Sequence, residues 1–420
     1  MEGDISPITS MAAAHNSFLS RKLSGMVAGM RQAEGASGRM TILRTAAVAR
    51  TPNAALASVG VFWGAFAALV PDIKAGIAAT DADFGFAMMA AAIGGIAAMA
   101  IAPWLMARLG RFGLPATGIV FALAFFYPLL PRGSFGFGLA MVAVGASVSL
   151  LDIAANMRLS VLEERHSRHL MNFSHAMFSF AFAASAFAAS LGRKAGYGPA
   201  EVLPVIAIVA LVLAALMWES RGWTDAAPAP EGSDRGTPWV PILLTAGVLL
   251  ASFVSENATE TWSALHIERT LGGPAGEGGF GPVAFGVTMG IGRLLGQVAA
   301  ARLGEAALIL WSAVIGVAGA LVIAAAPVPA IAVAGVGLLG IGVAVVVPSA
   351  NSILGRLVRP DQRAHAISRA WMVGFTGFFV GPSAMGLIAE YAGLRIAFLT
   401  IALVMAAIVP LVLAVKRRGG

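Results

Sequence analysis

Long apolar segments separated by short polar turns run through the chain from residue 54 almost to its end. An apolar segment of about 18 or more residues can cross the roughly 30 Å hydrocarbon layer of a membrane as one helix. The pattern predicts twelve such segments. The first six are expected at 54–71, 84–107, 114–130, 135–157, 171–191 and 201–218. The second six are expected at 241–265, 279–301, 305–325, 329–350, 367–388 and 394–415.

The second six segments repeat features of the first six. The sequence Ala-Arg-Leu-Gly at 107–110 returns at 301–304, and Ser-x-Ala at 174–176 returns at 368–370. Asn156 and Asn351 are separated by nearly the same offset. Duplicated helical halves are usual in membrane carriers, which bind their solute where the repeats meet. The expected fold class is therefore an all-α integral membrane protein with twelve transmembrane helices in two pseudo-symmetric six-helix bundles.

The composition agrees with a membrane protein. The chain is 58% hydrophobic and 12% charged, with a mean hydropathy of +0.83, whereas soluble domains carry roughly 25% charged residues. Its 50 glycines allow transmembrane helices to approach closely. The absence of cysteine excludes disulfides and thiolate metal sites. The basic residues lie scattered at helix ends rather than on one face, so we expect no nucleic-acid partner despite a pI near 10.5.

The distribution of Lys and Arg predicts the orientation, because cytoplasmic loops carry an excess of these residues. If the N-terminus is cytoplasmic, most of the 28 Lys and Arg fall on the cytoplasmic side. The opposite face then holds only Lys74, Arg132, Arg193, Lys194, Arg269 and Arg395. We therefore expect both termini in the cytoplasm and the chain in the inner membrane of a bacterium.

The predicted segments also set the domain boundaries. We expect an N-terminal bundle over 51–218 and a C-terminal bundle over 241–415, joined by a polar, Pro/Gly-rich cytoplasmic linker at 219–240. Residues 1–50 are expected to be a cytoplasmic extension, disordered or partly preceding the true start, with a surface amphipathic helix as the alternative. Residues 416–420 form a basic cytoplasmic tail.

Several short motifs carry a family resemblance. Phe-Trp-Gly at 62–64 precedes Pro-Asp-Ile-Lys at 71–74, and Leu-Asp-Ile-Ala-Ala-Asn occupies 151–156. Glu256 stands six residues before Trp262, and Gly-Arg-Leu-Leu-Gly follows at 292–296. Together with two repeats of six spans, these resemble the major facilitator superfamily, in particular a bacterial inner-membrane branch near the fucose-permease-like carriers. The resemblance implies a carrier, not an enzyme, and no cofactor.

The sequence departs from that family's pattern in ways that affect function. The family's loop after the second span usually reads Gly-x-Leu-x-Asp-Arg-x-Gly, and here the Asp is replaced by Ala107. Leu69 and Thr261 stand where the branch often has Arg and Asp. We therefore transfer no substrate from relatives.

Ionisable residues within spans are costly, at least about 2.5–3.5 kcal/mol each, and are candidates for function. A proton-coupled carrier needs a group that titrates as access alternates; burial favours its neutral form and a nearby cation favours a carboxylate. Glu256 is the first candidate for proton coupling because it lies furthest from either end of its helix, followed by Asp152 and His175. Amide side chains donate directional hydrogen bonds and indoles stack on flat solutes. The candidates for substrate binding are Asn156, Asn351, Glu260, Trp262 and Trp63.

Alternative interpretations remain open for these groups. Asp152 and His175 could form a gate network with Arg158 or Arg369, and Glu256 could be a structural partner of Arg293. Glu260 could instead be a solvated residue at the mouth of the carrier. The expected charge partners and gate residues are Arg293, Arg158, Arg369, Arg108 and Arg302. No catalytic residue and no metal site is expected.

The sequence thus predicts a monomeric secondary active transporter for a small-molecule substrate of the sugar, vitamin or nucleoside class. Symport with protons across the lipid bilayer is the favoured mechanism. A drug or metabolite exporter by proton antiport is the first alternative, favoured by a wide apolar cavity with Glu256 as its only charge. A non-transporting membrane sensor is the second, favoured by a filled central cavity.

Overall fold

The computed structural model describes residues 44–166, 170–219, 237–359 and 362–417. The chain separates into two compact units, residues 1–50 and 51–420. In the first unit, residues 44–48 are helical, and most of the expected N-terminal extension lies outside the described residues. Most of the expected linker and the end of the basic tail also lie outside them. Everything that follows concerns the unit 51–420.

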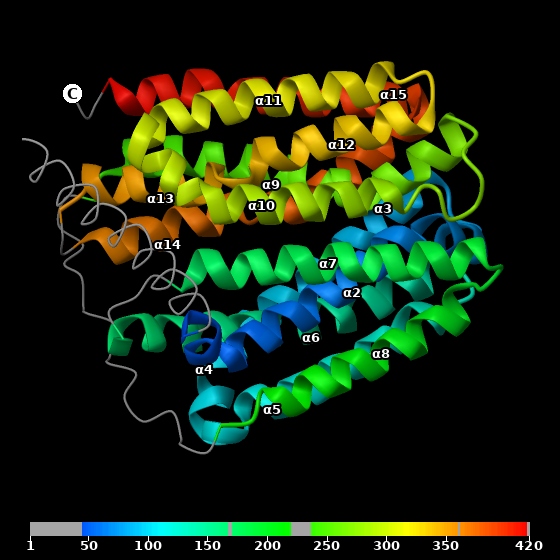
Figure 1. The fold of residues 1–420 in the computed structure, drawn as a ribbon, viewed down its shortest axis with the longest axis horizontal. Coiled ribbons are helices and arrows are strands. Elements are labelled where there is room, and N and C mark those ends of the chain that lie inside the picture. Colours follow the sequence, from blue (N-terminus) through cyan, green and yellow to red (C-terminus); the bar gives the residue numbers. More distant parts are fainter. Residues whose placement is uncertain (1–43, 167–169, 220–236, 360–361, 418–420) are drawn as a thin grey trace, which may run out of the picture. The chain divides into compact units, whose positions relative to one another are not determined.

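Every regular element among the described residues is a helix, and Figure 1 shows the helices of this unit running largely side by side. We call the helices before the linker the N-terminal group. It consists of α2 (Arg50–Gly76), α3 (Asp81–Met89), α4 (Ala91–Leu109), η1 (Gly110–Phe112), α5 (Gly113–Leu123), η2 (Ala124–Leu129), α6 (Ser134–His166), α7 (Met171–Lys194) and α8 (Pro199–Leu216).

The helices after the linker form the C-terminal group. It consists of α9 (Trp239–Leu265), η3 (His266–Thr270), α10 (Phe280–Leu303), α11 (Glu305–Ala325), α12 (Pro329–Ala344), α13 (Val346–Leu357), α14 (Arg363–Gly374) and α15 (Gly377–Lys416). The all-α membrane fold class is therefore as predicted.

The number of membrane crossings stays a prediction. Nine helical segments among the described residues are long and apolar enough to cross a membrane. Two of them, Asp81–Leu129 with 49 residues and His365–Lys416 with 52 residues, are each more than twice the roughly 20 residues that one crossing needs. Each of these two segments covers two of the twelve predicted spans, and the span predicted at 279–301 corresponds to a shorter apolar helix, Phe280–Gly296, which is not among the nine. These two facts account for the difference between the counts.

Three helix breaks lie in or between the predicted spans, and two of them have a local chemical reason. Pro348 has no N–H to donate to the carbonyl of Ala344, and α12 ends at that residue. Gly393 has φ 81° and ψ 162°, a conformation that breaks α15 between the last two predicted spans. The span expected at 84–107 is divided into α3 and α4 at Ala90.

Two helix–helix contacts join the N-terminal group to the C-terminal group. Within the groups, α4 packs on α6, α5 on α8, α9 on α15 and α11 on α12. Between the groups, α7 packs on α10 and α3 packs on α15. Close approach relies on glycine: a Cβ at Gly64 of α2 would lie 2.0 Å from the carbonyl oxygen of Phe182 in α7.

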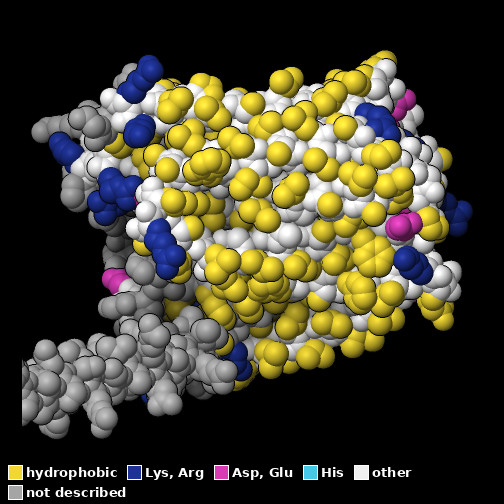
Figure 2. Space-filling view, turned by 45° about the horizontal axis from the view of Figure 1, so that its top comes forward, with side chains coloured by type: hydrophobic (Ala, Val, Ile, Leu, Met, Phe, Trp, Pro, Cys, Tyr) yellow, Lys and Arg dark blue, Asp and Glu magenta, His cyan; other side chains and the backbone are white. Residues whose placement is uncertain are grey.

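The surface is apolar where the helices are long. Figure 2 shows hydrophobic side chains spread over the middle of one face, with Lys, Arg, Asp and Glu gathered towards its two ends. Large apolar side chains such as Ile93 (65% exposed) and Trp311 (61% exposed) are exposed at the surface of this unit. An apolar surface of this extent between two charged rims is what a lipid bilayer covers.

Candidate functional site

A cavity of about 280 Å³ lies between the two helix groups. Both groups line it, so it occupies the interface that the sequence repeat predicts. Its polar and aromatic lining residues are Trp63 from α2, Ser149 and Asp152 from α6, Asn172, His175 and Phe178 from α7, Phe253, Glu256, Asn257 and Glu260 from α9, Arg293 from α10, Asn351 from α13, Trp371 from α14, Phe375 at the end of α14, and Phe378 and Phe379 from α15.

The cavity face of α9 follows from helical spacing. Phe253, Glu256 and Glu260 are separated by three and four residues, and this spacing places them on one face of a helix. All three line the cavity. The two carboxyl groups are largely buried, since Glu256 is 5% exposed and Glu260 is 9% exposed.

Arg293 neutralises one of these carboxylates and connects three helices. Its guanidinium donates to Glu256 Oε1 at 3.2 Å, to Ser179 Oγ at 2.7 Å and to the carbonyl oxygen of His175 at 3.2 Å. Glu256 belongs to α9, Arg293 to α10, and the other two residues to α7. Arg293 therefore links the N-terminal and C-terminal groups at the depth of the cavity.

Asp152 and His175 also line the cavity, but the arginines expected near them bind elsewhere. Asp152 Oδ2 accepts a hydrogen bond of 3.1 Å from Asn156 Nδ2, one turn further along α6. Arg158 binds Glu219, with Nη2 2.6 Å from Oε2. Arg369 donates to Thr237 Oγ1 at 2.7 Å and stacks over Trp239. The structure thus places Asp152 beside the cavity and these two arginines in separate contacts.

The residues predicted to bind substrate fall into two sets. Trp63, Asn351 and Glu260 line the cavity, and Asn351 Oδ1 accepts a 3.2 Å hydrogen bond from Trp371 Nε1. Asn156 and Trp262 lie outside the lining. The side-chain amide of Asn156 donates its hydrogen bond to the carboxylate of Asp152.

Trp262 has a structural position between the two helix groups. It is 0% exposed, donates from Nε1 to the carbonyl oxygen of Pro382 at 3.1 Å, and meets the ring of Phe84 edge-on. It follows Glu260 by two residues, about 200° around the helix, so it points away from the cavity face of α9. Its contacts hold α9 against α15 and α3.

Arg108 and Arg302 lie at helix ends, remote from the cavity lining. Arg108 is in the last turn of α4, and its guanidinium lies 4.9 Å from the ring centre of Trp104. Arg302 is exposed in the last turn of α10. The glycines of α10 pack, as the sequence suggests: a Cβ at Gly296 would lie 2.5 Å from Val345 Cγ1.

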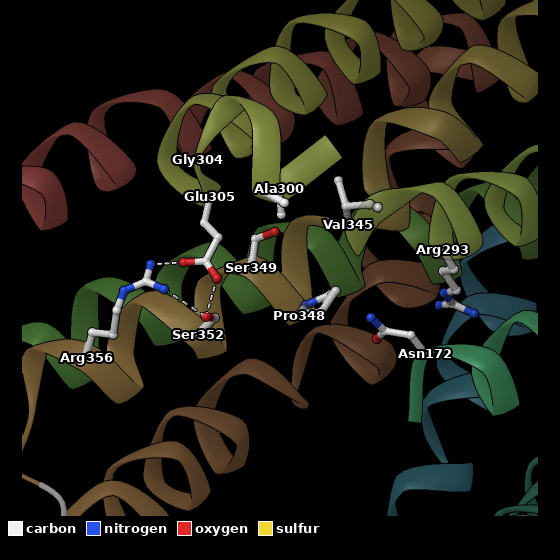
Figure 3. A pocket seen from close by; sticks show the side chains of 12 residues that line it. Asn172, Arg293, Ala300, Gly304, Glu305, Val345, Pro348, Ser349, Ser352 and Arg356 are labelled. Atoms are coloured by element: carbon white, nitrogen blue, oxygen red, sulfur yellow. Dashed lines mark hydrogen bonds and ion pairs between the residues drawn. The ribbon is translucent and has the colours of Figure 1, made fainter. Parts of the chain in front are cut away.

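A second cavity of about 730 Å³ leads from the first towards one end of the molecule. We call it the vestibule. Asn172, Arg293 and Pro348 line both cavities. Figure 3 shows Asn172 and Arg293 at one side of the vestibule and the ion pair of Arg356 and Glu305 at the other, where Ser352 donates to the same carboxylate. Arg356 is 61% exposed in its side chain, so this pair lies at the mouth. We call this the vestibule end.

The opposite end, which we call the latched end, is closed by a buried arginine. Arg193 of α7 donates to both carboxylate oxygens of Asp72 at 2.6 Å. It also pairs with Glu268 of η3, reaching Oε2 at 2.9 Å. The Arg193 side chain is only 2% exposed. A buried cation with two carboxylate partners joins the N-terminal group to the C-terminal group.

A second charge cluster strengthens the same end. Asp81, at the start of α3, is bound by Arg269 of η3 at 2.7 Å and by Lys74 at 3.0 Å. Its backbone N–H donates to Glu390 Oε2 of α15 at 2.8 Å. Sequence reasoning missed these contacts: it treated Arg193 and Arg269 as orientation signals, and Lys74 as an orientation signal and part of a family motif. The available signal was acidic residues next to basic ones at several helix ends.

Aromatic rings form one wall of the central cavity. Phe253 and Phe378 have ring centres 4.5 Å apart, Phe375 and Phe378 5.0 Å, and Phe253 and Trp371 5.4 Å. We call these four residues the aromatic wall. Among the described residues, no cluster of three or more His, Asp or Glu side chains could hold a metal ion.

Comparison with known proteins places the chain among membrane carriers. The sequence model described as the Major Facilitator Superfamily matches residues 244–419. An uncharacterised MFS-type transporter of Yersinia pestis is 27% identical over 363 residues, covering 85% of this chain and 93% of the relative. The membrane protein MosC of Rhizobium meliloti is 26% identical over 349 residues, covering 81% of this chain and 84% of that protein.

Solved structures share the fold at low sequence identity. A bacterial homologue of the human lysosomal transporter Spinster, in an inward-facing and occupied conformation, has a TM-score of 0.68 and 13% identity. The match covers 89% of this chain and 97% of that one. The nucleoside transporter NupG has a TM-score of 0.66 and 14% identity, with 88% of this chain and 99% of that chain covered.

Proposed function

Because the chain belongs to the major facilitator superfamily and is a membrane transporter, we propose that it moves a small polar solute by alternating access in symport with protons. The observation that carries the proposal is the central cavity, which both helix groups line and which contains Asp152, Glu256, Glu260 and Arg293. Ionisable side chains buried at an interface between repeats are the groups that such carriers use for coupling.

Proton coupling is assigned to Glu256 through its ion pair with Arg293. When Glu256 takes up a proton it loses its charge, and the attraction that holds the guanidinium weakens. Arg293 also holds Ser179 and the backbone of α7, so its release changes a contact between the two groups. Protonation at the cavity therefore acts on the interface that has to rearrange. Asp152 and His175, which line the same cavity, are the second candidates.

The orientation follows from the distribution of charge. We place both termini in the cytoplasm, in the inner membrane of a bacterium, and treat residues 51–218 and 241–415 as the two bundles of a monomeric carrier. The vestibule end is then cytoplasmic, and the conformation is inward-facing.

The two alternative functions have distinct structural requirements. A drug or metabolite exporter by proton antiport would be favoured by a wide apolar cavity with Glu256 as its only charge, but Asp152, His175, Glu260 and Arg293 line this one too. A non-transporting sensor was expected to have a filled centre, but a cavity and a vestibule are present. Both observations favour import of a polar solute.

Uptake into proteoliposomes tests the proposal. Solutes that raise the melting temperature of the purified protein are first selected from sugars, vitamins and nucleosides, because a ligand stabilises the folded state that binds it. An inward proton gradient should then drive the selected solute uphill. Glu256→Gln should reduce uphill uptake at least about tenfold and preserve counterflow exchange, since exchange needs no net proton movement.

Glu164→Gln is the matched control, because Glu164 is an exposed carboxyl group near the end of α6 and outside the cavity. It should transport like the unmodified protein. Uphill uptake by Glu256→Gln with unchanged dependence on pH would assign the proton to another group, and Asp152→Asn would be measured next. Absence of any solute movement in the unmodified protein would contradict transport by symport.

A further inference from the structure

Glu260 differs from every other charged group in the central cavity. Glu256 is bound by Arg293, and Asp152 is bound by Asn156. Within the described parts of the chain, no hydrogen bond or ion pair reaches the carboxylate of Glu260. Glu260 as a whole is 9% exposed, and it lines the central cavity. A carboxylate so deeply buried without a partner is costly unless a ligand supplies one.

The one arginine of the cavity is already engaged. Its side chain is 16% exposed, and its donors reach Glu256, Ser179 and the backbone of His175. An anionic solute would have to displace these contacts while lying near three carboxyl groups, Asp152, Glu256 and Glu260. The charge of the cavity therefore disfavours an anion and favours a cation.

The aromatic wall supplies a second surface for a cation. Phe253, Trp371, Phe375 and Phe378 line the same cavity as Glu260, and Phe253 precedes Glu260 by two helical turns on the same face of α9. The faces of aromatic rings attract ammonium groups and also bury apolar parts of a solute. At about 280 Å³, the cavity suits a small organic molecule.

We propose that the transported solute is a small organic cation, an amine or quaternary ammonium compound, whose charged nitrogen binds Glu260 while its body packs on the aromatic wall. This inference rests on the proposed function and narrows its substrate class. It also assigns two roles to α9: Glu260 binds the solute, and Glu256, the partner of Arg293, binds the proton. The two carboxylates are one helical turn apart, so solute and proton act at neighbouring, separate positions.

Matched pairs of probes test the inference on the purified full-length protein. Phenethylamine is compared with neutral 2-phenylethanol, and choline with neutral 3,3-dimethylbutanol, by thermal stabilisation at pH 7. We expect at least one cation to bind at least about tenfold more tightly than its neutral partner. Glu260→Gln should abolish that preference, and Glu260→Asp should keep part of it. Glu164→Gln should leave it unchanged.

The melting temperatures without probe show whether each variant is folded, and Glu260→Asp provides a second variant of the same charge. Equal binding of both members of each pair, or no binding of either cation, would overturn the inference. Proton-driven uptake of a neutral sugar would also overturn it, while leaving the proposed symport intact. Glu260-dependent binding of a cation that never crosses a liposome membrane would instead contradict the proposed transport and keep the binding site.

Discussion

The two ends of the molecule use the same kind of interaction for different purposes. At the latched end, the ion pairs of Arg193 with Glu268 and of Arg269 with Asp81 each join the N-terminal group to the C-terminal group. Among the ion pairs of the described residues, that of Glu305 and Arg356 at the vestibule end stays within the C-terminal group, and that of Arg158 and Glu219 involves no residue of the C-terminal group.

This difference shows that the position of an ion pair decides its role. A pair between the groups is broken whenever they separate, so it stabilises one conformation relative to the other. A pair within a group survives the movement and stabilises both conformations about equally, so it shifts no population. The latched end is therefore expected to control access, and the vestibule end to leave the groups free to move.

Removal of the Arg193 side chain should break the latched end most strongly. In Arg193→Gln, Asp72 and Glu268 lose the cation that they share. The Arg193 side chain is only 2% exposed, so this cation is buried. Removing one partner of a buried pair costs about 3–5 kcal/mol. The conformation with an open vestibule should lose population by about tenfold or more.

The natural absence of cysteine makes this measurable. A single cysteine at Ala300, which lines the vestibule, reports access through its rate of reaction with a maleimide. That rate should fall in Arg193→Gln. It should also fall in Glu268→Gln, a variant that removes only the pair between the groups and keeps the pair of Arg193 with Asp72. Arg132→Gln is the control, because Arg132 is exposed in the turn before α6. Labelling as fast as in the parent protein would show that this buried network does not act as a latch.

A smaller effect is expected from the close approach of α3 and α15. A Cβ at Gly386 would lie 2.4 Å from the carbonyl oxygen of Asp81 and 3.1 Å from the ring of Trp262. Gly386→Ala should therefore push the two helices apart at a cost of about 1–3 kcal/mol and slow labelling at Ala300 several-fold. Gly76→Ala, where a Cβ meets nothing within 4 Å, should label like the parent. Equal rates in both variants would mean that the contact of α3 with α15 does not hold this conformation.

The same comparison shows what sequence could and could not reveal. The helical pattern was readable because each helix has to cover its backbone with apolar side chains along its whole length. The cavity face of α9 was readable in part, since helical spacing links Glu256 and Glu260. Trp262 was predicted as a substrate contact. It follows Glu260 by two residues, however, and therefore lies on the opposite side of the helix.

Acidic residues next to basic ones at helix ends were visible, but which of them pair in the latched end could not be predicted, because its members come from elements far apart in the chain. Asp72 ends α2, Arg193 ends α7 and Glu268 lies in η3. A charge at a helix end also fits the rule for membrane orientation, so each residue had a sufficient explanation by itself. The engagement of Arg158 by Glu219 was hidden for the same reason, since nothing in local spacing links α6 to the segment after α8.

The smallest effect is expected at the mouth of the vestibule. Arg356 is 61% exposed, and its partner Glu305 belongs to the same helix group. Exposed ion pairs contribute about 0–1 kcal/mol, and a pair within one group is kept in both conformations. Arg356→Gln should therefore lower the melting temperature slightly and change labelling at Ala300 by less than about twofold. Labelling faster than in the parent by much more than about twofold would mean that Arg356 meets the N-terminal group in the other conformation, which the substitution would then destabilise. The vestibule end would then carry a latch of its own, and the contrast between the two ends would describe only the conformation seen here.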